Sequence, residues 1–120
     1  MTATPAADLL VTLAEPTRLR ILNCLAAAPL FVSDLQSILD LPQSTVSRHL
    51  QVLRRSGLVR DTPLAPFVLY RLRRETGAQG RMVSAVLAAV AQDPPMQAER
   101  ALAETRSRAQ LRTRAGADES

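Results

Sequence analysis

The segment QSTVSRHLQVLRRSGLV, residues 43–59, decides the fold of this chain. Val46, Leu50 and Leu53 follow one another at spacings of four and three, so they share one face of a predicted helix. Gly57 is the residue type that commonly ends helices in a left-handed conformation. The other face is polar and basic, and residues 43–60 contain no Asp or Glu. A solvated helix usually mixes both signs of charge, so this face indicates a negatively charged partner.

The residues before this helix predict a second, shorter helix joined to it by a tight turn. Ser33 and Gln36 have the spacing of a capping box, and apolar residues follow them at helical intervals. Pro42 ends the connection between the two helices. Two short helices joined in this way are typical of a helix-turn-helix, whose second helix enters the DNA major groove by its N-terminal end.

The whole chain predicts a mainly α-helical fold of five to six helices with one small β-hairpin wing. Pro16 suits the first turn of a helix, and two short strands flank the sequence PLAP. Besides the helix-turn-helix, the expected helices cover residues 6–14, 16–28 and 80–92, and the expected strands cover residues 58–62 and 67–72. We assign residues 1–93 to a winged helix-turn-helix domain for DNA binding and dimerisation. Residues 94–120 are expected to form a helix-prone, partly disordered tail, because they offer few apolar anchors.

The polar face of the helix supplies candidate DNA contacts. Glutamine and arginine read base edges through paired hydrogen bonds, while serine and threonine hydroxyls and the free N–H groups of a helix start bind phosphates. The alternative is a solvated face on which Ser44 or Thr45 only caps the helix. The candidates facing outward are Gln43, Ser44, Thr45, Ser47, Arg48 and His49, with Arg54 further along, toward the flanking DNA backbone.

Composition agrees with a negatively charged partner and excludes several classes of protein. All fifteen basic residues among 120 are arginines and the formal net charge is +4, although genome composition also explains an arginine bias. A single cysteine excludes an internal disulfide. The N-terminal segment lacks a charged region before its apolar run, and the longest mainly apolar stretch, residues 83–91, is too short to span a bilayer. We therefore expect a cytoplasmic protein without membrane contact.

Several separated motifs, in the right order, resemble the ArsR/SmtB family of bacterial winged helix-turn-helix regulators. They are LAEPTRLRILNCL, VSDLQSILDLPQSTVSRHLQVLRRSGLV and YRL, which together span about residues 9–72. The resemblance implies a homodimer, built from the first and last helices, that reads an inverted repeat with two recognition helices. It also implies a wing that touches DNA beside them. The DNA contacts that it implies fall on Gln43, Ser44, Ser47 and Arg48, with His49 close by.

The wing departs from the pattern of the family that it resembles. Family wings commonly carry glycine and arginines at the tip, whereas this tip is stiffened by Pro63 and Pro66 and carries no charge. Arg60 and Arg71 in the strands are then its candidate DNA contacts. Leu64 is compatible with packing against a partner or the minor groove, or with an ordinary rigid loop.

The segment RMVSAVLAAVAQ, residues 81–92, is apolar almost all round, which predicts burial on more than one side. In so small a chain the second side fits the helix of a partner subunit, and the first helix would join the same seam. The alternative is a helix that only fills the core of a monomer. The predicted dimerisation residues are Leu9, Leu10, Leu13, Met82, Val83, Val86, Leu87 and Val90.

The sensing sites that the resemblance implies are absent from the sequence. There is no cysteine pair at FVSDL and no histidine in RMVSAVLAAVAQD, and Val52, Ser56 and Met96 stand where thiols would be expected. We therefore predict no metal and no cofactor. Cys24 fits a core position, although Arg20 four residues earlier keeps redox sensing open. The sequence leaves three sources open for the signal that controls DNA binding. They are a separate metal- or ligand-sensing protein, an unrecognised small ligand, and expression level alone.

The sequence thus predicts a sequence-specific DNA-binding transcriptional regulator. The alternative is a winged-helix protein-interaction module, which the uncharged wing tip favours and the acid-free helix face opposes. An enzyme is not expected, because the chain contains no recognisable nucleophile–base pair, glycine-rich phosphate loop or carboxylate cluster.

Overall fold

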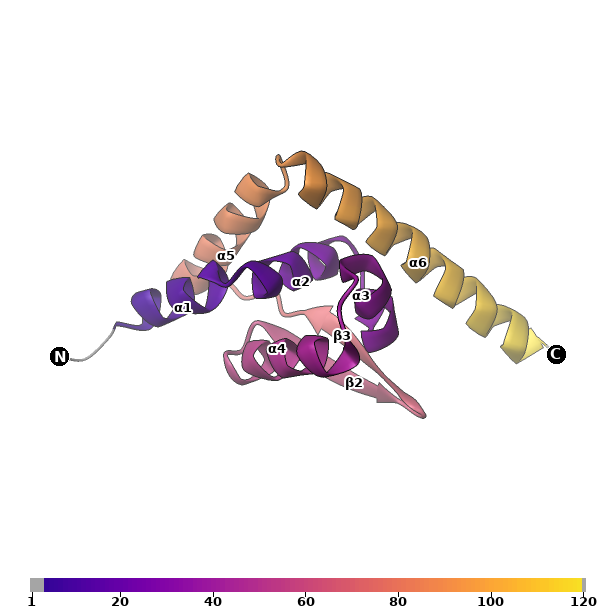
Figure 1. Ribbon diagram of the computed structural model, residues 1–120. Helices are drawn as coiled ribbons and strands as arrows, with labels where there is room; N and C mark the ends of the chain where they lie inside the picture. The colour runs from indigo at the N-terminus through magenta and orange to yellow at the C-terminus, as the bar shows by residue number, and fades with distance from the viewer. Residues whose placement is uncertain (1–3, 120) are drawn as a thin grey trace.

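The computed structural model describes residues 4–119 and, for side chains, residues 4–113. Helices dominate, and a small antiparallel sheet is inserted among them (Figure 1). None of the described helices combines the length and the hydrophobicity needed to cross a membrane. The helices are α1 (Pro5–Ala14), α2 (Pro16–Ala27), α3 (Val32–Leu39), α4 (Gln43–Arg55), α5 (Gly77–Val90) and α6 (Pro94–Glu119). The strands are β1 (Leu30–Phe31), β2 (Val59–Leu64) and β3 (Phe67–Leu72).

The predicted helix-turn-helix is confirmed as α3 and α4, which pack on each other and on α2. Val46, Leu50 and Leu53 are fully buried, as their spacing predicts. Gly57 has a φ of 77°, so it supplies the left-handed residue just after α4. A side chain with a Cβ atom would adopt this conformation only at a cost, which explains the abrupt end of the helix.

The sheet has the order β1-β3-β2, one strand more than the predicted hairpin. Leu64 pairs with Phe67, so Ala65 and Pro66 form the turn at the tip. In β1, Leu30 pairs with Tyr70 and anchors the base of the hairpin to the start of α3. A strand of two residues carries too little periodicity to be recognised in the sequence.

The start of α3 differs from the prediction. Ser33 and Gln36 do not form the capping box, because the helix begins earlier, at Val32, directly after the residues that pair with β3. The carboxylate of Asp34 takes this role: its Oδ2 accepts a hydrogen bond of 2.9 Å from the Phe31 backbone N–H. Asp34 is 1% exposed, so a buried carboxylate stabilises the start of the helix-turn-helix.

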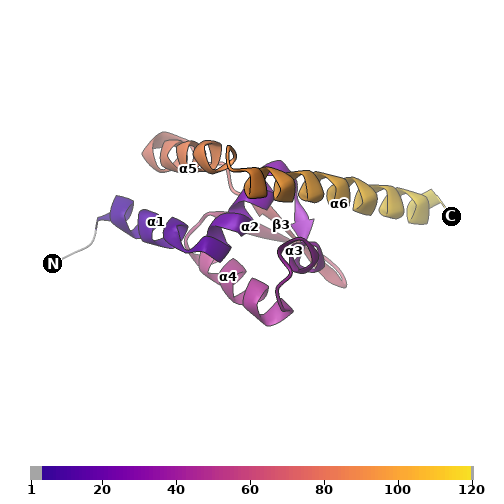
Figure 2. The ribbon, with the colours of Figure 1, turned by 45° about the horizontal axis from the view of Figure 1, so that its top comes forward.

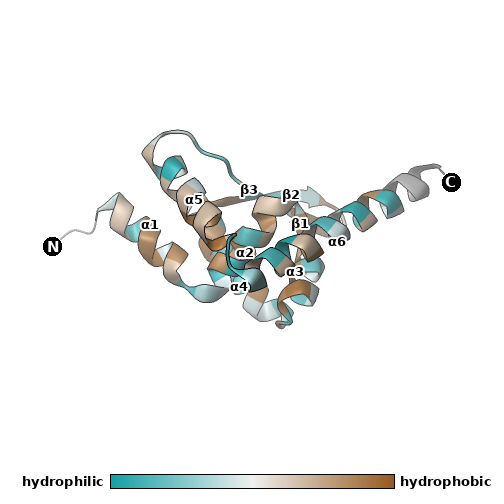
Figure 3. Ribbon diagram, turned by 90° about the horizontal axis from the view of Figure 1, so that it is seen from above, coloured by the Kyte–Doolittle hydropathy of each residue, from teal (hydrophilic) through white to brown (hydrophobic). Residues whose placement is uncertain are grey.

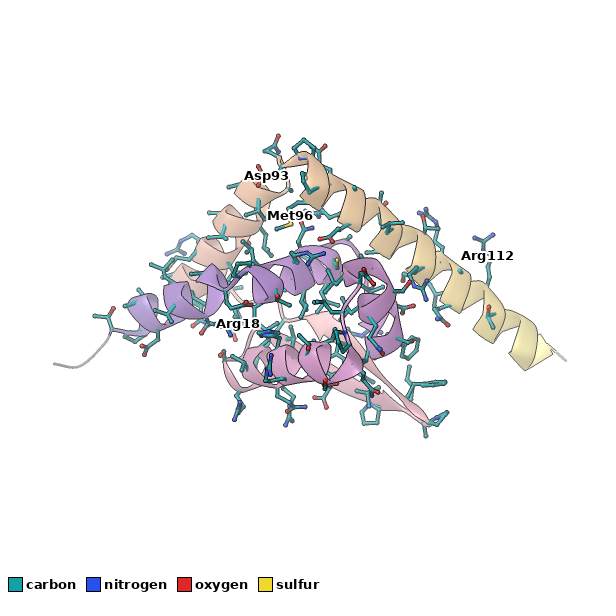
Figure 4. The ribbon with its side chains drawn as sticks, in the orientation of Figure 1. Arg18, Asp93, Met96 and Arg112 are labelled. Atoms are coloured by element: carbon teal, nitrogen blue, oxygen red, sulfur yellow. The ribbon has the colours of Figure 1, made fainter. Side chains whose placement is uncertain are left out.

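The segment predicted as a separate tail is the long helix α6, and much of it packs on the domain. Figure 2 shows α6 lying across α2 and extending beyond α3, and both helices contact it. Arg20 forms an ion pair with Glu99, with Nε to Oε1 at 3.0 Å. Met96 lies below the apex between α5 and α6, and its carbonyl accepts a hydrogen bond from Asn23 Nδ2 at 3.0 Å (Figure 4). Helix α6 therefore packs on the rest of the domain through α2 and α3.

Candidate nucleic-acid interface

Helix α4 begins without a capping side chain. Pro42 is the N-cap residue, and the first intrahelical bond runs from the Val46 N–H to the Pro42 carbonyl at 3.1 Å. The interpretation that Ser44 or Thr45 caps the helix is therefore wrong for the described structure. Among the residues that the structure describes, no side chain caps the first-turn backbone N–H groups, and such groups attract anions.

Helix α4 lies on the side of the molecule opposite α5 and α6 (Figure 1), and its exposed residues form a polar stripe. Ser44, Arg48, Gln51 and Arg55 are exposed at spacings of four, three and four, which places them on one helical face. Gln43 is also exposed, while Thr45 and Ser47 are half-buried at the margins. Gln51 was not among the predicted contacts, although its spacing from Ser44 and Arg48 could have indicated it.

His49 does not lie on this face, which corrects the prediction of an outward-facing side chain. The side chain is only 12% exposed, and its Nδ1 lies 3.8 Å from Glu15 Oε2. The same Glu15 oxygen accepts a hydrogen bond of 2.8 Å from the Arg18 N–H at the start of α2. His49 follows the buried Val46 by three residues, so it shares the inner side of α4 and packs toward the junction of α1 and α2.

Arg54 remains at the edge of the interface, but part of its charge is engaged. Its Nη2 donates to Gln51 Oε1 at 3.2 Å, and its Nη1 lies 4.0 Å from Asp61 Oδ1 on β2. Both members of this ion pair are exposed to a large degree, so the pair is weak and can yield to a phosphate.

Arg60 and Arg71 lie on the other side of the wing. They are directly opposite each other in the register of β2 and β3, one position along from the pair formed by Asp61 and Tyr70. Side chains of neighbouring strand positions point to opposite faces, and Asp61 is on the face near α4 through its contact with Arg54. The two arginines therefore face away from α4, and the structure does not bring them together with the outer stripe.

The wing tip is apolar rather than basic. Phe67 is exposed beside the turn, and its ring meets the Phe31 ring edge to face at a centroid distance of 5.8 Å. This contact joins the wing to the start of α3.

The predicted dimerisation residues divide into two groups. Leu9, Leu13, Val83 and Leu87 are buried within the single chain, so they contribute to its core. Figure 3 shows that α1 and α5 consist largely of hydrophobic residues and lie away from the C-terminal end of α6. Some of these residues remain exposed. Leu10 is 49% exposed, and Val11, which was not predicted, is also exposed. Met82, Val86 and Val90 on α5 are half-buried.

No group of three His, Cys, Asp or Glu side chains that could together hold a metal ion occurs among the described residues. Cys24 is fully buried. Its burial, reinforced by the nearby Glu99 carboxylate, raises the pKa of the thiol to about 12. The Arg20 guanidinium acts in the opposite direction, but its effect on this pKa is smaller than that of burial.

Cys24 is therefore expected to be unreactive in the native protein. A thiol with a pKa of about 12 is almost entirely protonated at pH 8, and the thiolate is the reactive form. Alkylation by iodoacetamide at pH 8 should be about 100-fold slower, or more, than in the urea-unfolded chain, whose thiol has an ordinary pKa near 8.5. The measurement is mass spectrometry of samples quenched over time. Equal alkylation rates in the native and unfolded protein would contradict this expectation and would favour redox sensing at Cys24.

A helix-turn-helix with a polar outer face on its second helix, followed by a β-hairpin, defines the winged-helix class of DNA-binding proteins. Residues 13–62 match the family description "Helix-turn-helix domain". The chain is 40% identical over 86 residues to the biofilm growth-associated repressor of Agrobacterium fabrum, covering 72% of each protein. It is 43% identical over 91 residues to the HTH-type transcriptional regulator CmtR of Mycobacterium tuberculosis, covering 74% of this chain and 76% of that protein.

Solved structures agree with these relatives. The structure of reduced HlyU from Vibrio cholerae superposes with a TM-score of 0.64 at 36% sequence identity, covering 73% of this chain and 90% of that one. The chain belongs to the ArsR family of winged helix-turn-helix regulators, as the sequence motifs predict. It is a DNA-binding transcriptional regulator and not an enzyme.

Proposed function

We propose that this regulator binds an inverted-repeat operator as a homodimer and reads each half-site with the N-terminal half of α4. The observation that carries the proposal is the exposed, acid-free stripe on α4 that includes Ser44 and Arg48. Arg48 and Gln43 have the donors and acceptors that read guanine and adenine edges in the major groove. Ser44, Ser47 and Thr45, with the free N–H groups of the first turn, hold the adjacent phosphates. Arg54 contacts the flanking backbone.

The dimer of this proposal forms through α1 and α5. Exposing an apolar surface that includes Leu10, Val11 and Val86 to water is energetically unfavourable for so small a protein. A two-fold pairing buries the same patch on both copies. It also presents two copies of α4, which suits an operator whose half-sites are about one helical turn apart.

We also propose that operator binding is not controlled by a metal at the positions that its family uses. Support comes from the residues at those positions, Val52, Ser56 and Met96, which offer no thiolate or imidazole. A separate sensor protein or a small ligand would then control operator binding.

Arg48→Ala is the direct test of the reading face. The operator is first obtained by sequencing genomic fragments that the protein captures. Loss of the guanidinium should then weaken specific binding by about 1–3 kcal/mol, measured by fluorescence anisotropy at fixed salt. Thermal stability should stay unchanged, because the Arg48 side chain is exposed.

Arg112→Ala is the matched control, since Arg112 is an exposed arginine on α6, away from α4 and from the proposed dimer surface. It should bind the operator as the parent does. Parental affinity in Arg48→Ala would show that α4 does not read bases through this residue. Failure to capture any specific fragment would favour the protein-interaction module, for which the exposed Phe67 at the wing tip is a suitable contact.

A further inference from the structure

An apolar cleft of about 280 Å³ lies between the wing and α6. Leu64 and Leu69 line it from the wing, and Phe31 lines it from the start of α3. Leu111 closes it from α6, and Pro29 lies at its base. This volume is just below the range of about 300–1,000 Å³ that is usual for small-molecule sites, and its lining is mostly apolar. The cleft therefore suits the apolar part of a small ligand.

The acidic residue in the wall of this cleft is already neutralised. Asp34 Oδ1 accepts hydrogen bonds from Arg106 Nε at 3.0 Å and from Gln110 Nε2 at 3.3 Å, both on α6. Its Oδ2 is taken by the Phe31 backbone N–H. The carboxylate thus has partners for both oxygens and presents no free charge that would repel an anion.

Arg71 gives the cleft a positive edge. Its side chain is half-buried and lines both the apolar cleft and a neighbouring hollow of about 610 Å³. No ion pair or hydrogen bond of the Arg71 side chain occurs among the side chains that the structure describes. The hollow also contains Arg60, directly opposite Arg71 in the sheet, together with Arg73 and Arg74, and its lining has no acidic residue. Like charges held opposite each other are unfavourable, so an anion at Arg71 would relieve this repulsion.

We propose that this cleft binds a small amphipathic anion, an aliphatic or aromatic carboxylate, with its apolar body between Leu69 and Leu111 and its carboxylate on Arg71. The apolar walls supply the burial, and the guanidinium supplies a paired, charge-assisted contact that selects a carboxylate over an alcohol. The regulator then carries its own ligand site, at a position separate from the outer face of α4.

Ligand binding in the cleft would couple to the wing, because its walls belong to different elements. Leu64 and Leu69 move with the hairpin, whereas Leu111 belongs to α6, which is held to α2 and α3. A ligand that contacts both walls favours one wing position over others, and it can shift operator binding only by that difference in affinity. This regulatory consequence rests on the proposed function, whereas the binding site itself does not.

The test is calorimetric titration of octanoate and benzoate, with octanol as the uncharged counterpart, into the full-length protein without DNA. At least one carboxylate should bind saturably at one site per chain, and octanol should bind about tenfold more weakly than octanoate. Arg71→Gln should weaken carboxylate binding by about tenfold. Leu111→Glu should abolish it, because a second carboxylate would then lie in the apolar wall. Leu111 is 65% exposed, so this variant should still fold.

Two variants control for unspecific effects. Leu102→Glu changes an exposed leucine of the same helix that does not line the cleft, and Arg112→Gln changes an arginine that points away from the protein body (Figure 4). Both should bind octanoate as the parent does. The proposal is overturned if neither carboxylate binds saturably, if octanol binds as tightly as octanoate, or if Arg71→Gln and Leu111→Glu bind like the parent. Operator binding is measured separately, so a protein that binds octanoate but no operator contradicts only the proposed function.

Discussion

Leu10→Glu should dissociate the proposed homodimer and weaken operator binding by about 100-fold or more. Each protomer would then hold a single half-site without the effective concentration supplied by its partner. Leu10 is 49% exposed in the single chain, so a charge at this position is tolerated in the folded protomer but not in an apolar seam. Sedimentation velocity reports the dissociation, and fluorescence anisotropy with the captured operator reports the loss of affinity.

Leu102→Glu serves as the matched control for this experiment. Leu102 is 50% exposed, almost the same as Leu10, but it lies on α6 rather than on the surface of α1 and α5. It should leave both the sedimentation coefficient and operator affinity unchanged. A dimeric Leu10→Glu variant with parental affinity would place the dimer interface elsewhere.

Asp34→Ala should lower the free energy of unfolding by about 3 kcal/mol. The substitution removes the buried carboxylate that accepts a hydrogen bond from the Phe31 N–H and that Arg106 and Gln110 share as a partner. Because α6 packs on α3 at this point, both the start of the helix-turn-helix and the docking of α6 lose their common anchor. Urea unfolding followed by circular dichroism, at one protein concentration, measures the change.

Asp61→Ala makes the same chemical deletion at an exposed carboxylate. Its ion pair with Arg54 spans 4.0 Å at the surface, so its loss should change stability by less than about 0.5 kcal/mol. Asp34→Asn should fall between the two, since an amide oxygen can still accept from the Phe31 N–H but carries no charge. An Asp34→Ala variant as stable as the Asp61→Ala variant would contradict the anchoring role of Asp34.

Local pattern was enough to predict the helix-turn-helix and its inner face. The spacing of Val46, Leu50 and Leu53, and the helix stop at Gly57, depend only on helical geometry and on residue type. The packing of α6 was not predictable in this way. It depends on contacts such as Arg20 with Glu99, which are 79 residues apart, and α6 itself has few apolar anchors. A helix with so weak an apolar face looks like a solvated tail until its partners are known.

In the candidate site, too, helical spacing predicts some side-chain positions, whereas others depend on tertiary packing. Arg48 and Ser44 face outward as the helical spacing predicts. The spacing of three residues from Val46 places His49 on the inner side of α4. Its burial, however, depends on where the junction of α1 and α2 packs against α4. The face on which Arg60 and Arg71 lie is fixed by the register of β2 and β3, and a shift of one residue would reverse it. Register depends on the turn and on the core beneath it, which residue types alone do not reveal.

The uncapped start of α4 links DNA binding to folding. In the proposed binding mode, a phosphate that accepts hydrogen bonds from the first-turn N–H groups supplies the acceptors that no side chain in the described part of the chain provides. In the proposed binding mode such a phosphate binds the folded helix, so by mass action it would stabilise the native state by an amount that rises with the logarithm of DNA concentration. Every phosphate offers the same oxygens, so this gain is equal for all sequences. In the proposed binding mode the operator is then distinguished from other DNA by the base edges that α4 reaches, and not by this phosphate contact.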